Sequence, residues 1–248
     1  MARAAKKTIG AKSEKSAMAT APKDRIIDAL MALAAEERFE EITLKQIAGR
    51  ANVSLSEFRE HFSSRYGVLA AFGRRIDRIV LEGVTDDLAE ENDRERLFDV
   101  LMRRFDAMAP YREALRGVSE WARREPFHAA LLSPLAVNSM RFMLEAAGVD
   151  TGGRIGRLKA RGLTLAWARI ANIWLHDEDP GSARTMAELD RALTRGEKVL
   201  ARAQDVDRLI SPLRAMARGA AGACWRLARD GARRRADRRD ANVAANEI

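Results

Sequence analysis

The sequence predicts an all-α fold, and three observations support this prediction. Apolar residues recur at spacings of three and four along most of the 248-residue chain, as they do on one face of a helix. The chain contains only six prolines, and runs of β-branched residues are few. Hydrophobic residues make up 47% of the total, which suffices for a sizeable core.

The composition also argues against several classes of protein. The sequence has no apolar run of roughly 18 residues or more, so it predicts no membrane-spanning helix. Residues 1–23 are basic but lack the apolar centre of a secretory signal, and a transit peptide is the alternative interpretation of this segment. Cys224 is the only cysteine, which excludes a disulfide within the chain and predicts a cytoplasmic protein.

The net charge of +8 is located at the two ends of the chain. Residues 1–25 and residues 225–239 each hold seven Lys or Arg against two acidic residues, so the remainder of the chain has a net charge of −2. Either basic end would attract a polyanion such as DNA or an anionic lipid surface.

The first elements along the chain are a tail and a helix. Residues 1–22 are rich in Ala, Lys and Ser and predict a disordered basic tail, with an arm that contacts DNA as the alternative. Residues 23–37 carry the apolar stripe of an amphipathic helix. Phe39 and Ile42 then anchor the crossing to the next helix.

Two short helices are predicted within residues 43–69. Thr43 is a suitable N-cap for the first, and Asn52 favours the left-handed conformation that ends it. Ser54 and Glu57 form the S-x-x-E capping box of the second. The apolar residues Leu44, Ile47, Ala48 and Ala51 are predicted to share one face of the first helix. The buried face of the second is predicted to be Phe58 and Phe62. Two short helices across a tight connection are typical of a helix-turn-helix.

The motifs T-L-K-Q-I-A, A-N-V-S, H-F and S-S-R-Y, at this spacing, resemble the N-terminal domain of TetR-type regulators over residues 24–69. The resemblance implies an N-terminal three-helix helix-turn-helix domain and a larger helical domain for ligand binding and dimerisation. The recognition helix departs from the family pattern, because Ser56, Glu57 and Arg59 stand where a small residue, Thr and a phosphate-binding Tyr are usual. Glu57 and Glu60 would face a polyanion.

The residues expected to contact DNA share this domain. They are Thr43, Lys45, Ser54, Ser56, Arg59, His61 and Arg65. Arg59 and Arg65 are assigned to phosphates because guanidinium groups pair well with phosphate oxygens.

The chain beyond residue 62 predicts further helices. A long helix is expected to start at Ser63 or Ser64, to run to about Glu90 and to link the small domain to the rest. Helices are then predicted over residues 94–108, 111–124, 127–147 and 154–174. The helix over 127–147, with a kink or break at Pro134, carries Met, Phe and Leu on more than one face, which predicts burial on several sides.

Some large apolar residues of these helices are candidates for lining a ligand cavity, although residues of this kind are more often plain core. The candidates are Met108, Trp121, Met140, Met143, Trp167 and Trp174. The resemblance to TetR-type regulators implies that two late helices form the dimer interface, and the helices expected over 154–174 and after Pro180 are the candidates. A dimer matters because two recognition helices must reach major grooves about 34–36 Å apart.

The last part of the chain, from Asp205, has the pattern of a basic amphipathic helix. This helix either packs on its own domain or docks on a membrane surface through residues 205–239. We expect four regions. They are a tail (1–22), the helix-turn-helix domain (23–69), the ligand-binding and dimerisation domain (70–230) and an Arg-rich tail (231–248).

A second resemblance involves the block Trp174-Leu175-His176-Asp177 and the segment over residues 185–193, which contains L-D-R. Both are similar to the C-terminal part of the TetR-like lipid-binding accessory proteins of ubiquinone biosynthesis. That resemblance implies the same fold, an isoprenoid lipid in the helical domain, docking on membranes by a terminal amphipathic helix, and no action on DNA.

No pattern predicts an enzyme, a metal site or a cofactor. His61, His128 and His176 lack the i, i+4 spacing and the companion ligands of a metal site. The acidic residues 177–179 are interpreted as a loop and helix cap, and Cys224 as a packing residue.

With the resemblance to TetR-type regulators, the sequence predicts a homodimeric transcriptional regulator, a repressor that binds a DNA operator and responds to a small apolar ligand or lipid. The alternative is a lipid-binding or membrane accessory protein that does not bind DNA.

Overall fold

The computed structural model describes residues 21–84, 90–179 and 181–202, and all regular secondary structure within these ranges is helical. The predicted all-α class is thus confirmed. The predictions for the basic tail up to residue 20, for Pro180, and for the segment 205–239 with Cys224 lie outside the described residues. The predicted domain boundaries remain predictions.

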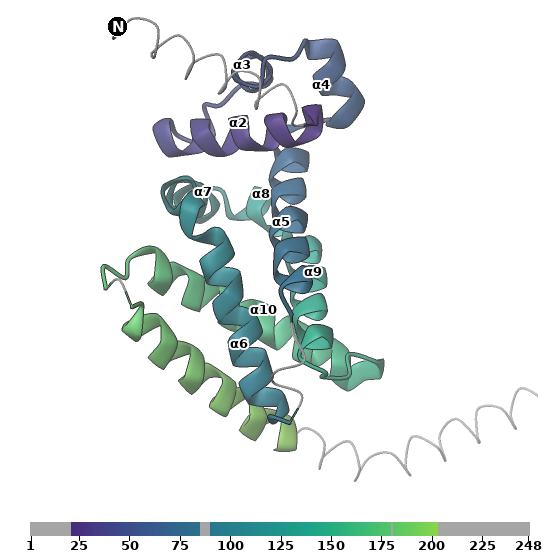
Figure 1. The fold of residues 1–248 in the computed structure, drawn as a ribbon, viewed down its shortest axis with the longest axis vertical. Coiled ribbons are helices and arrows are strands. Elements are labelled where there is room, and N and C mark those ends of the chain that lie inside the picture. Colours follow the sequence, from purple (N-terminus) through teal and green to yellow (C-terminus); the bar gives the residue numbers. More distant parts are fainter. Residues whose placement is uncertain (1–20, 85–89, 180, 203–248) are drawn as a thin grey trace, which may run out of the picture. The chain divides into compact units, whose positions relative to one another are not determined.

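Three helices form the N-terminal cluster, namely α2 (Pro22–Glu36), α3 (Leu44–Arg50) and α4 (Leu55–His61) (Figure 1). The turn between α3 and α4 contains Asn52 with a φ of 51°, as its helix-ending role predicts. The large, almost fully buried side chains of this cluster are Ile26, Ile27, Leu30, Phe39, Ile42, Ile47 and Phe58. The cluster is therefore the predicted helix-turn-helix arrangement.

Helix α5 (Arg65–Glu82) follows directly, after the N-cap Ser64, whose Oγ accepts a hydrogen bond from the Gly67 amide at 3.1 Å. It is shorter than predicted, because it ends at Gly83 rather than near residue 90. Glycine is a poor helix former, since its backbone loses the most conformational freedom on folding. The predicted C-terminal end of this helix is therefore wrong.

Helices α6 (Asp93–Met108) and α9 (Ser133–Ala146) pack with α5, and α10 (Gly153–Leu175) packs on α9. Helix α9 contacts each of the other three, and α6 also contacts α5 (Figure 1). Residues 183–202 are helical as well, and Leu189 and Leu193 are buried. Buried side chains from α2 to Leu193 belong to one continuous hydrophobic cluster.

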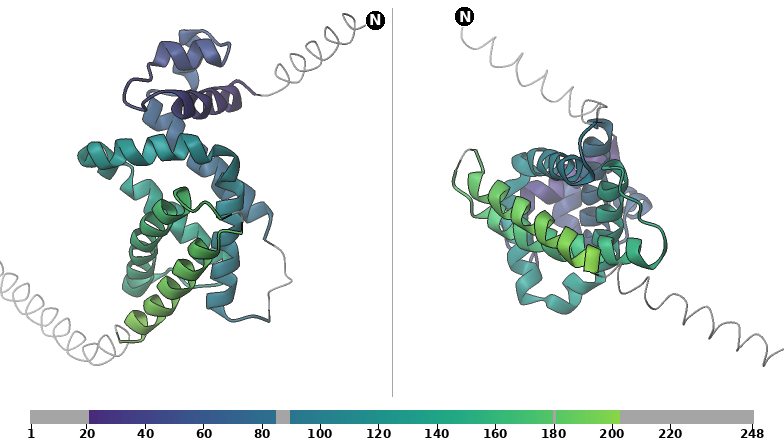
Figure 2. Two further views of the ribbon diagram at one scale, coloured as in Figure 1. Left: turned by 90° about the vertical axis from the view of Figure 1, so that its left-hand side faces the viewer. Right: turned by 90° about the horizontal axis from the view of Figure 1, so that it is seen from below.

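Helix α7 (Arg112–Arg124) is the main support of the N-terminal cluster. It begins after a 3₁₀ turn, η2 (Ala109–Tyr111), in which Pro110 produces the predicted break. Helix α7 crosses α2 steeply, and this pair makes the most extensive contact between two helices in the described ranges (Figures 1 and 2). The small helix-turn-helix core is thus completed by a helix that lies about fifty residues further along the chain.

Residues 127–147 are divided into two helices close to the predicted break at Pro134, but they are not buried on several sides as predicted. Helix α8 (Pro126–Leu131) ends before Leu132, and Pro134 lies in the first turn of α9. The break redirects the chain, so only one face of α9 meets the bundle. Its buried residues are Ser139, Met140, Met143 and Leu144, whereas Phe127, Leu131, Leu135 and Phe142 are exposed.

Candidate functional site

The exposed face of α3 and α4 is the candidate nucleic-acid interface. Phe58 fixes α4 to the core by one edge and is 2% exposed. Lys45 on α3 and Ser56, Arg59 and His61 on α4 are exposed. The structure therefore places four of the seven predicted contact residues on the accessible surface of the two helices.

Two more of the predicted contact residues are helix caps. The Thr43 Oγ1 accepts a hydrogen bond from the Gln46 amide at 3.2 Å, and the Gln46 Oε1 accepts one from the Thr43 amide at 2.8 Å. The Ser54 Oγ accepts a bond from the Glu57 amide at 3.0 Å. These bonds satisfy amides that a helix leaves free at its start, so both hydroxyl groups have a structural role.

The Glu57 side chain does not complete the capping box predicted with Ser54. Its Oε1 lies 3.8 Å from the Arg25 Nη2 of α2, in an ion pair. This arginine offsets one of the two acidic charges on α4. Glu60 is exposed.

The helix-turn-helix domain as a whole is not basic. Residues 23–69 contain seven Lys or Arg and eight Asp or Glu, which gives a net charge of −1. Several of the cations also pair within the domain, for example Arg50 with Glu36. Positive charge directed at a polyanion is therefore limited to a few side chains, chiefly Lys45 and Arg59.

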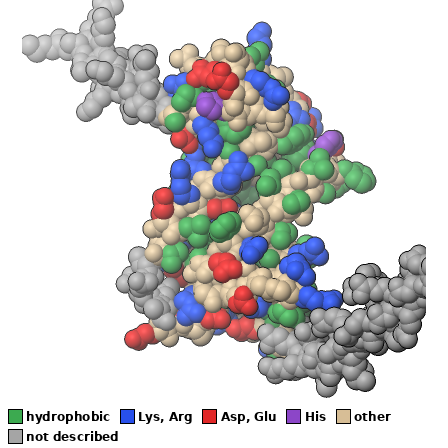
Figure 3. Space-filling model, turned by 90° about the vertical axis from the view of Figure 1, so that its right-hand side faces the viewer, with side chains coloured by type: hydrophobic (Ala, Val, Ile, Leu, Met, Phe, Trp, Pro, Cys, Tyr) green, Lys and Arg blue, Asp and Glu red, His purple; other side chains and the backbone are tan. Residues whose placement is uncertain are grey.

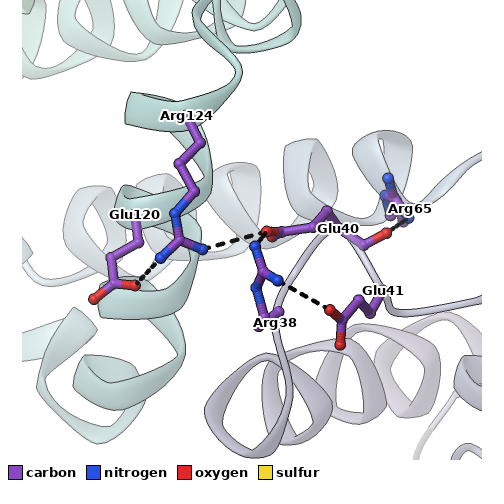
Figure 4. A network of polar contacts seen from close by, with 6 residues as sticks. All are labelled: Arg38, Glu40, Glu41, Arg65, Glu120 and Arg124. Atoms are coloured by element: carbon purple, nitrogen blue, oxygen red, sulfur yellow. Dashed lines mark hydrogen bonds and ion pairs between the residues drawn. The ribbon is translucent and has the colours of Figure 1, made fainter.

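The structure gives Arg65 a different environment from the one predicted. Its Nη1 donates to the backbone carbonyls of Glu40 and Ile42, both at 3.0 Å (Figure 4). Its guanidinium lies over the rings of Phe39 and Tyr66, 5.6 Å and 5.2 Å from their centroids. These contacts fasten the start of α5 to the segment before α3, so the geometry does not favour the phosphate role predicted for Arg65.

Glu40 joins this region to α7. Its Oε1 lies 2.5 Å from the Arg38 Nη2 and 3.3 Å from the Arg124 Nη1, and Arg124 also pairs with Glu120 (Figure 4). The pKa of the Glu40 carboxyl is lowered, chiefly by a hydrogen bond from its own backbone amide. Burial opposes this effect, whereas the charge of Arg38 and the hydrogen bond and charge of Arg124 add to it. The side chains of Arg38, Glu40, Glu120 and Arg124 are all at least partly exposed, so their ion pairs contribute little to the stability of the fold. We therefore assign this network to positioning α7 against the segment before α3.

One of the predicted ligand-lining residues lies apart from the others. Trp121 of α7 is 1% exposed and packs between Phe39 and Tyr66, with centroid distances of 4.9 Å and 5.5 Å. It therefore belongs to the core that joins α7 to the N-terminal cluster.

Two of the other candidates, Met143 and Trp167, contact a buried ion pair in the bundle. Arg104 of α6 binds Asp77 of α5, and the Ser139 Oγ donates to the same carboxylate oxygen at 2.6 Å. The Arg104 guanidinium also lies 3.7 Å from the Met143 sulfur and 5.3 Å from the Trp167 centroid. Trp167 and Trp174 both pack on the Phe105 ring, at 4.4 Å and 5.3 Å, and Met140 is buried on the same face of α9 as Met143.

Sequence reasoning did not identify Asp77, Arg104 and Ser139. The signal was present, since Arg104 occupies a position on the apolar stripe of α6 that includes Leu97, Leu101 and Met108. A charged residue at a core position requires a partner in the interior. The sequence cannot show which helix supplies that partner.

The block of residues that carried the second resemblance has a structural role here. The Asp177 carboxylate is buried and accepts bonds from the Thr185 amide at 2.9 Å and the Thr185 hydroxyl at 2.7 Å. The hydrogen bond from the Thr185 hydroxyl is the main cause of a lowered pKa of Asp177. Burial acts in the opposite direction, whereas the hydrogen bonds from backbone amides and the charge of Arg112 also lower this pKa. Asp177 therefore fixes the start of the helix over residues 183–202, as a cap does.

Metal sites and membrane-spanning helices are the remaining features to consider in the described residues. Within residues 21–84, 90–179 and 181–202, no group of three or more His, Cys, Asp and Glu side chains is arranged to hold a metal ion. The helices in the same ranges include none that is long and apolar enough to cross a bilayer.

Comparison with known proteins relates the fold to one class of regulator. No protein-family model matches the sequence, and no curated protein matches it significantly. A TetR transcriptional regulator from Nitrosomonas europaea ATCC 19718 superposes with a TM-score of 0.58 and 27% identity, over 72% of this chain and 99% of that one. A TetR transcriptional regulator from Rhodococcus sp. RHA1 gives 0.54 and 19%, over 71% and 94%. The chain therefore has the fold of TetR-type transcriptional regulators.

Proposed function

We propose that this protein is a DNA-binding transcriptional regulator. The observation that carries the proposal is the geometry of α4, which is capped at Ser54, held to the core by Phe58, and accessible along the rest of its surface. A helix fixed by one edge can enter a major groove without unfolding its domain. The two structural neighbours support the proposal, since both are described as transcriptional regulators.

The contacts divide by chemistry. Lys45 and Arg59 are the phosphate-binding side chains, because they are exposed cations on adjacent helices. Ser56 and His61 lie on the same helix as Arg59 and are suited to base edges. Arg25 supports binding indirectly by pairing with Glu57.

A homodimer would present two such helices to successive turns of DNA. The exposed apolar residues of α10, Leu158 and Leu165, together with Met186 on the following helix, support these two helices as the dimer face. Two-fold symmetry would then match a palindromic operator with half-sites about 34–36 Å apart.

Ligand response would act through α5. This helix carries the N-terminal cluster on its first turns and Asp77 in the middle of its length, where Arg104 and Ser139 hold it to α6 and α9. A small apolar ligand or lipid that enters among Met143, Trp167 and their neighbours would disturb this ion pair. The result would be a shift of α5 that changes the separation of the two α4 helices, which suits a repressor released by its ligand.

The test is a gel-shift titration of the full-length protein with the promoter region of its own operon at rising salt. Arg59→Ala and Lys45→Ala should each weaken binding and reduce the salt slope by about 0.9 for each phosphate that the variant no longer neutralises. Arg38→Ala is the matched control, because Arg38 pairs with Glu40 and Glu41 beside α7 instead of lying on α3 or α4. Absence of a specific, salt-sensitive shift for the wild type would overturn the proposal.

A second candidate is a lipid-binding accessory protein that does not bind DNA. The observation that favours it is the net charge of −1 of residues 23–69, together with the exposed Glu60 on α4. DNA-binding domains usually concentrate positive charge on the contacting face. Mass spectrometry of an organic extract of the purified protein distinguishes the two. Stoichiometric isoprenoid lipid without a DNA shift favours this candidate, and a specific shift excludes it.

A further inference from the structure

A segment without charge interrupts an otherwise charged chain. Residues 126–140 form the longest run that lacks Asp, Glu, Lys and Arg. At the average of 32% charged residues, a segment of this length would hold about five. The absence is notable because most of the segment faces outward.

The large apolar side chains of this region are among the most exposed in the described ranges. Phe127 and Leu131 on α8 are 88% and 72% exposed, and Leu135 and Phe142 on α9 are 44% and 49% exposed. We name these four residues the α8–α9 apolar corner. Hydrophobic side chains gather on the face formed by α5, α8 and α9 in the space-filling view (Figure 3). Large exposed apolar side chains that gather in one region are uncommon on soluble monomers and indicate an interaction.

The corner is not required for the packing of α9. The opposite face of that helix buries Met140 and Met143 against the bundle. Helix α8 has six residues and lies at the turn between α7 and α9 (Figure 2). Phe127 and Leu131 on α8 therefore project outward from a turn.

The size of the corner argues against a second copy of the chain as its occupant. A stable interface buries about 800 Å² on each partner, with roughly 20–30 residues a side. Four side chains on a short helix and on one face of α9 fall well below that requirement.

The charges beside the corner argue against a charged partner. The Glu125 Oε2 lies 3.1 Å from the His128 Nδ1, and Arg124 pairs with both Glu120 and Glu40. The charges of Arg124, Glu120 and Glu40 therefore have opposite partners in the protein, and the Glu125 carboxylate has a hydrogen-bond partner. The surface is therefore complementary to an apolar, uncharged phase.

We propose that the α8–α9 apolar corner inserts into the interfacial layer of a lipid bilayer and docks the protein peripherally on a membrane. A few large apolar side chains suffice for such binding, because its strength scales with the apolar area buried among the lipids. Binding through this corner depends on neither DNA binding by α4 nor the presence of anionic lipids. It is thus separable from docking through the Arg-rich residues 225–239, which would need anionic lipid and would weaken with salt.

The first test is flotation of the full-length protein with vesicles of pure phosphatidylcholine at high salt, where electrostatic binding is suppressed. The wild type should float, and the double variant Phe127→Ser/Leu131→Ser should bind at least roughly tenfold more weakly. Leu131→Ser alone should also weaken binding. Leu55→Ser is its matched control, since Leu55 is a leucine on α4 that is 53% exposed. The proposal would be overturned if the double variant bound the vesicles as well as the wild type does, or if Leu55→Ser weakened binding as much as Leu131→Ser does.

The second test reports on position and does not depend on the folding of the serine variants. In a Cys224→Ser background, Leu131→Cys and Leu55→Cys are labelled with an environment-sensitive fluorophore. Addition of the same neutral vesicles should shift the emission at residue 131 to the blue and leave that at residue 55 unchanged. No shift at residue 131 contradicts insertion. A shift at 131 that follows protein concentration without vesicles would instead assign the corner to self-association and would also overturn the proposal.

Discussion

Gly117 of α7 lies so close to Ala34 of α2 that a Cβ atom at residue 117 would stand 2.7 Å from the Ala34 carbonyl oxygen. Real Cβ atoms do not approach a backbone oxygen to this distance. Glycine at this position therefore allows α7 to support the helix-turn-helix domain from the side opposite its exposed face.

Gly117→Ala should destabilise the protein by about 1–3 kcal/mol, because the added methyl group must push α7 away from α2. Urea denaturation followed by circular dichroism measures the change in the free energy of unfolding. Gly73→Ala is the matched control, since Gly73 lies within α5 and has open space where the Cβ would be. The control should be neutral or stabilising by about 0.5–1 kcal/mol. Equal destabilisation by both variants would contradict the close approach.

The ion pair between Asp77 and Arg104 should behave as a buried pair. Asp77→Ala leaves the arginine charged and without its partner in the interior, and should destabilise the protein by about 3–5 kcal/mol. The double variant Asp77→Leu/Arg104→Met removes both charges and should recover most of that loss. A double-mutant cycle in urea gives the coupling energy. Additive single effects would show that the two side chains do not act as a pair.

Asp177 should make stability depend on pH in a defined direction. Its folded-state pKa is lowered chiefly by the Thr185 hydroxyl, so the carboxylate stabilises the fold above the unfolded pKa of about 3.9. This contribution is lost as the pH falls through the lower, folded-state pKa. Asp177→Asn should therefore be destabilising by about 0.5–2 kcal/mol at neutral pH, with a difference from wild type that narrows below about pH 4.

Urea denaturation at a series of pH values measures this dependence. Glu178→Gln is the control, because Glu178 is the exposed neighbour of Asp177 and its substitution removes the same charge. A constant difference between Asp177→Asn and wild type down to the lowest pH would show that the carboxylate charge is not the cause.

Thr43 should contribute to stability independently of DNA. Its capping box with Gln46 is extended by a bond from the Gln46 Nε2 to the Glu37 Oε2 at 2.9 Å. Thr43→Ala should therefore reduce the free energy of unfolding by about 0.5–2 kcal/mol, whereas Thr43→Ser should retain most of it. Thermal unfolding without DNA separates this effect from any loss of operator binding. An unchanged midpoint for Thr43→Ala would contradict the cap.

Local chemistry made the helix-turn-helix predictable. Thr43, Asn52, Ser54 and Ser64 each act through bonds or backbone angles within a few residues, and the structure places all four as helix starts or as the turn. The exposure of Ser56 and Arg59 likewise follows from the periodicity around Phe58. These features depend on neighbours in sequence, so a single sequence suffices to identify them.

Pairings between distant residues were not predictable in the same way. Arg65 was predicted to contact a phosphate, but its partners are carbonyls about 25 residues earlier. The segment over 127–147 has the composition of a buried helix, and its exposure depends on the direction the chain takes after Pro126 and Leu132. Composition does not specify that direction.

The sequence by itself determined the all-α class, most helix starts and the identity of the helix-turn-helix, because caps and apolar periodicity act over one or two helical turns. Tertiary structure alone decided which charges are buried together, as with Asp77 and Arg104, and that α7 reaches α2 at Gly117. It also decided that Phe127 and Leu131 face outward. These outcomes depend on how helices far apart in the chain pack in space, and packing partners are not encoded in local spacing.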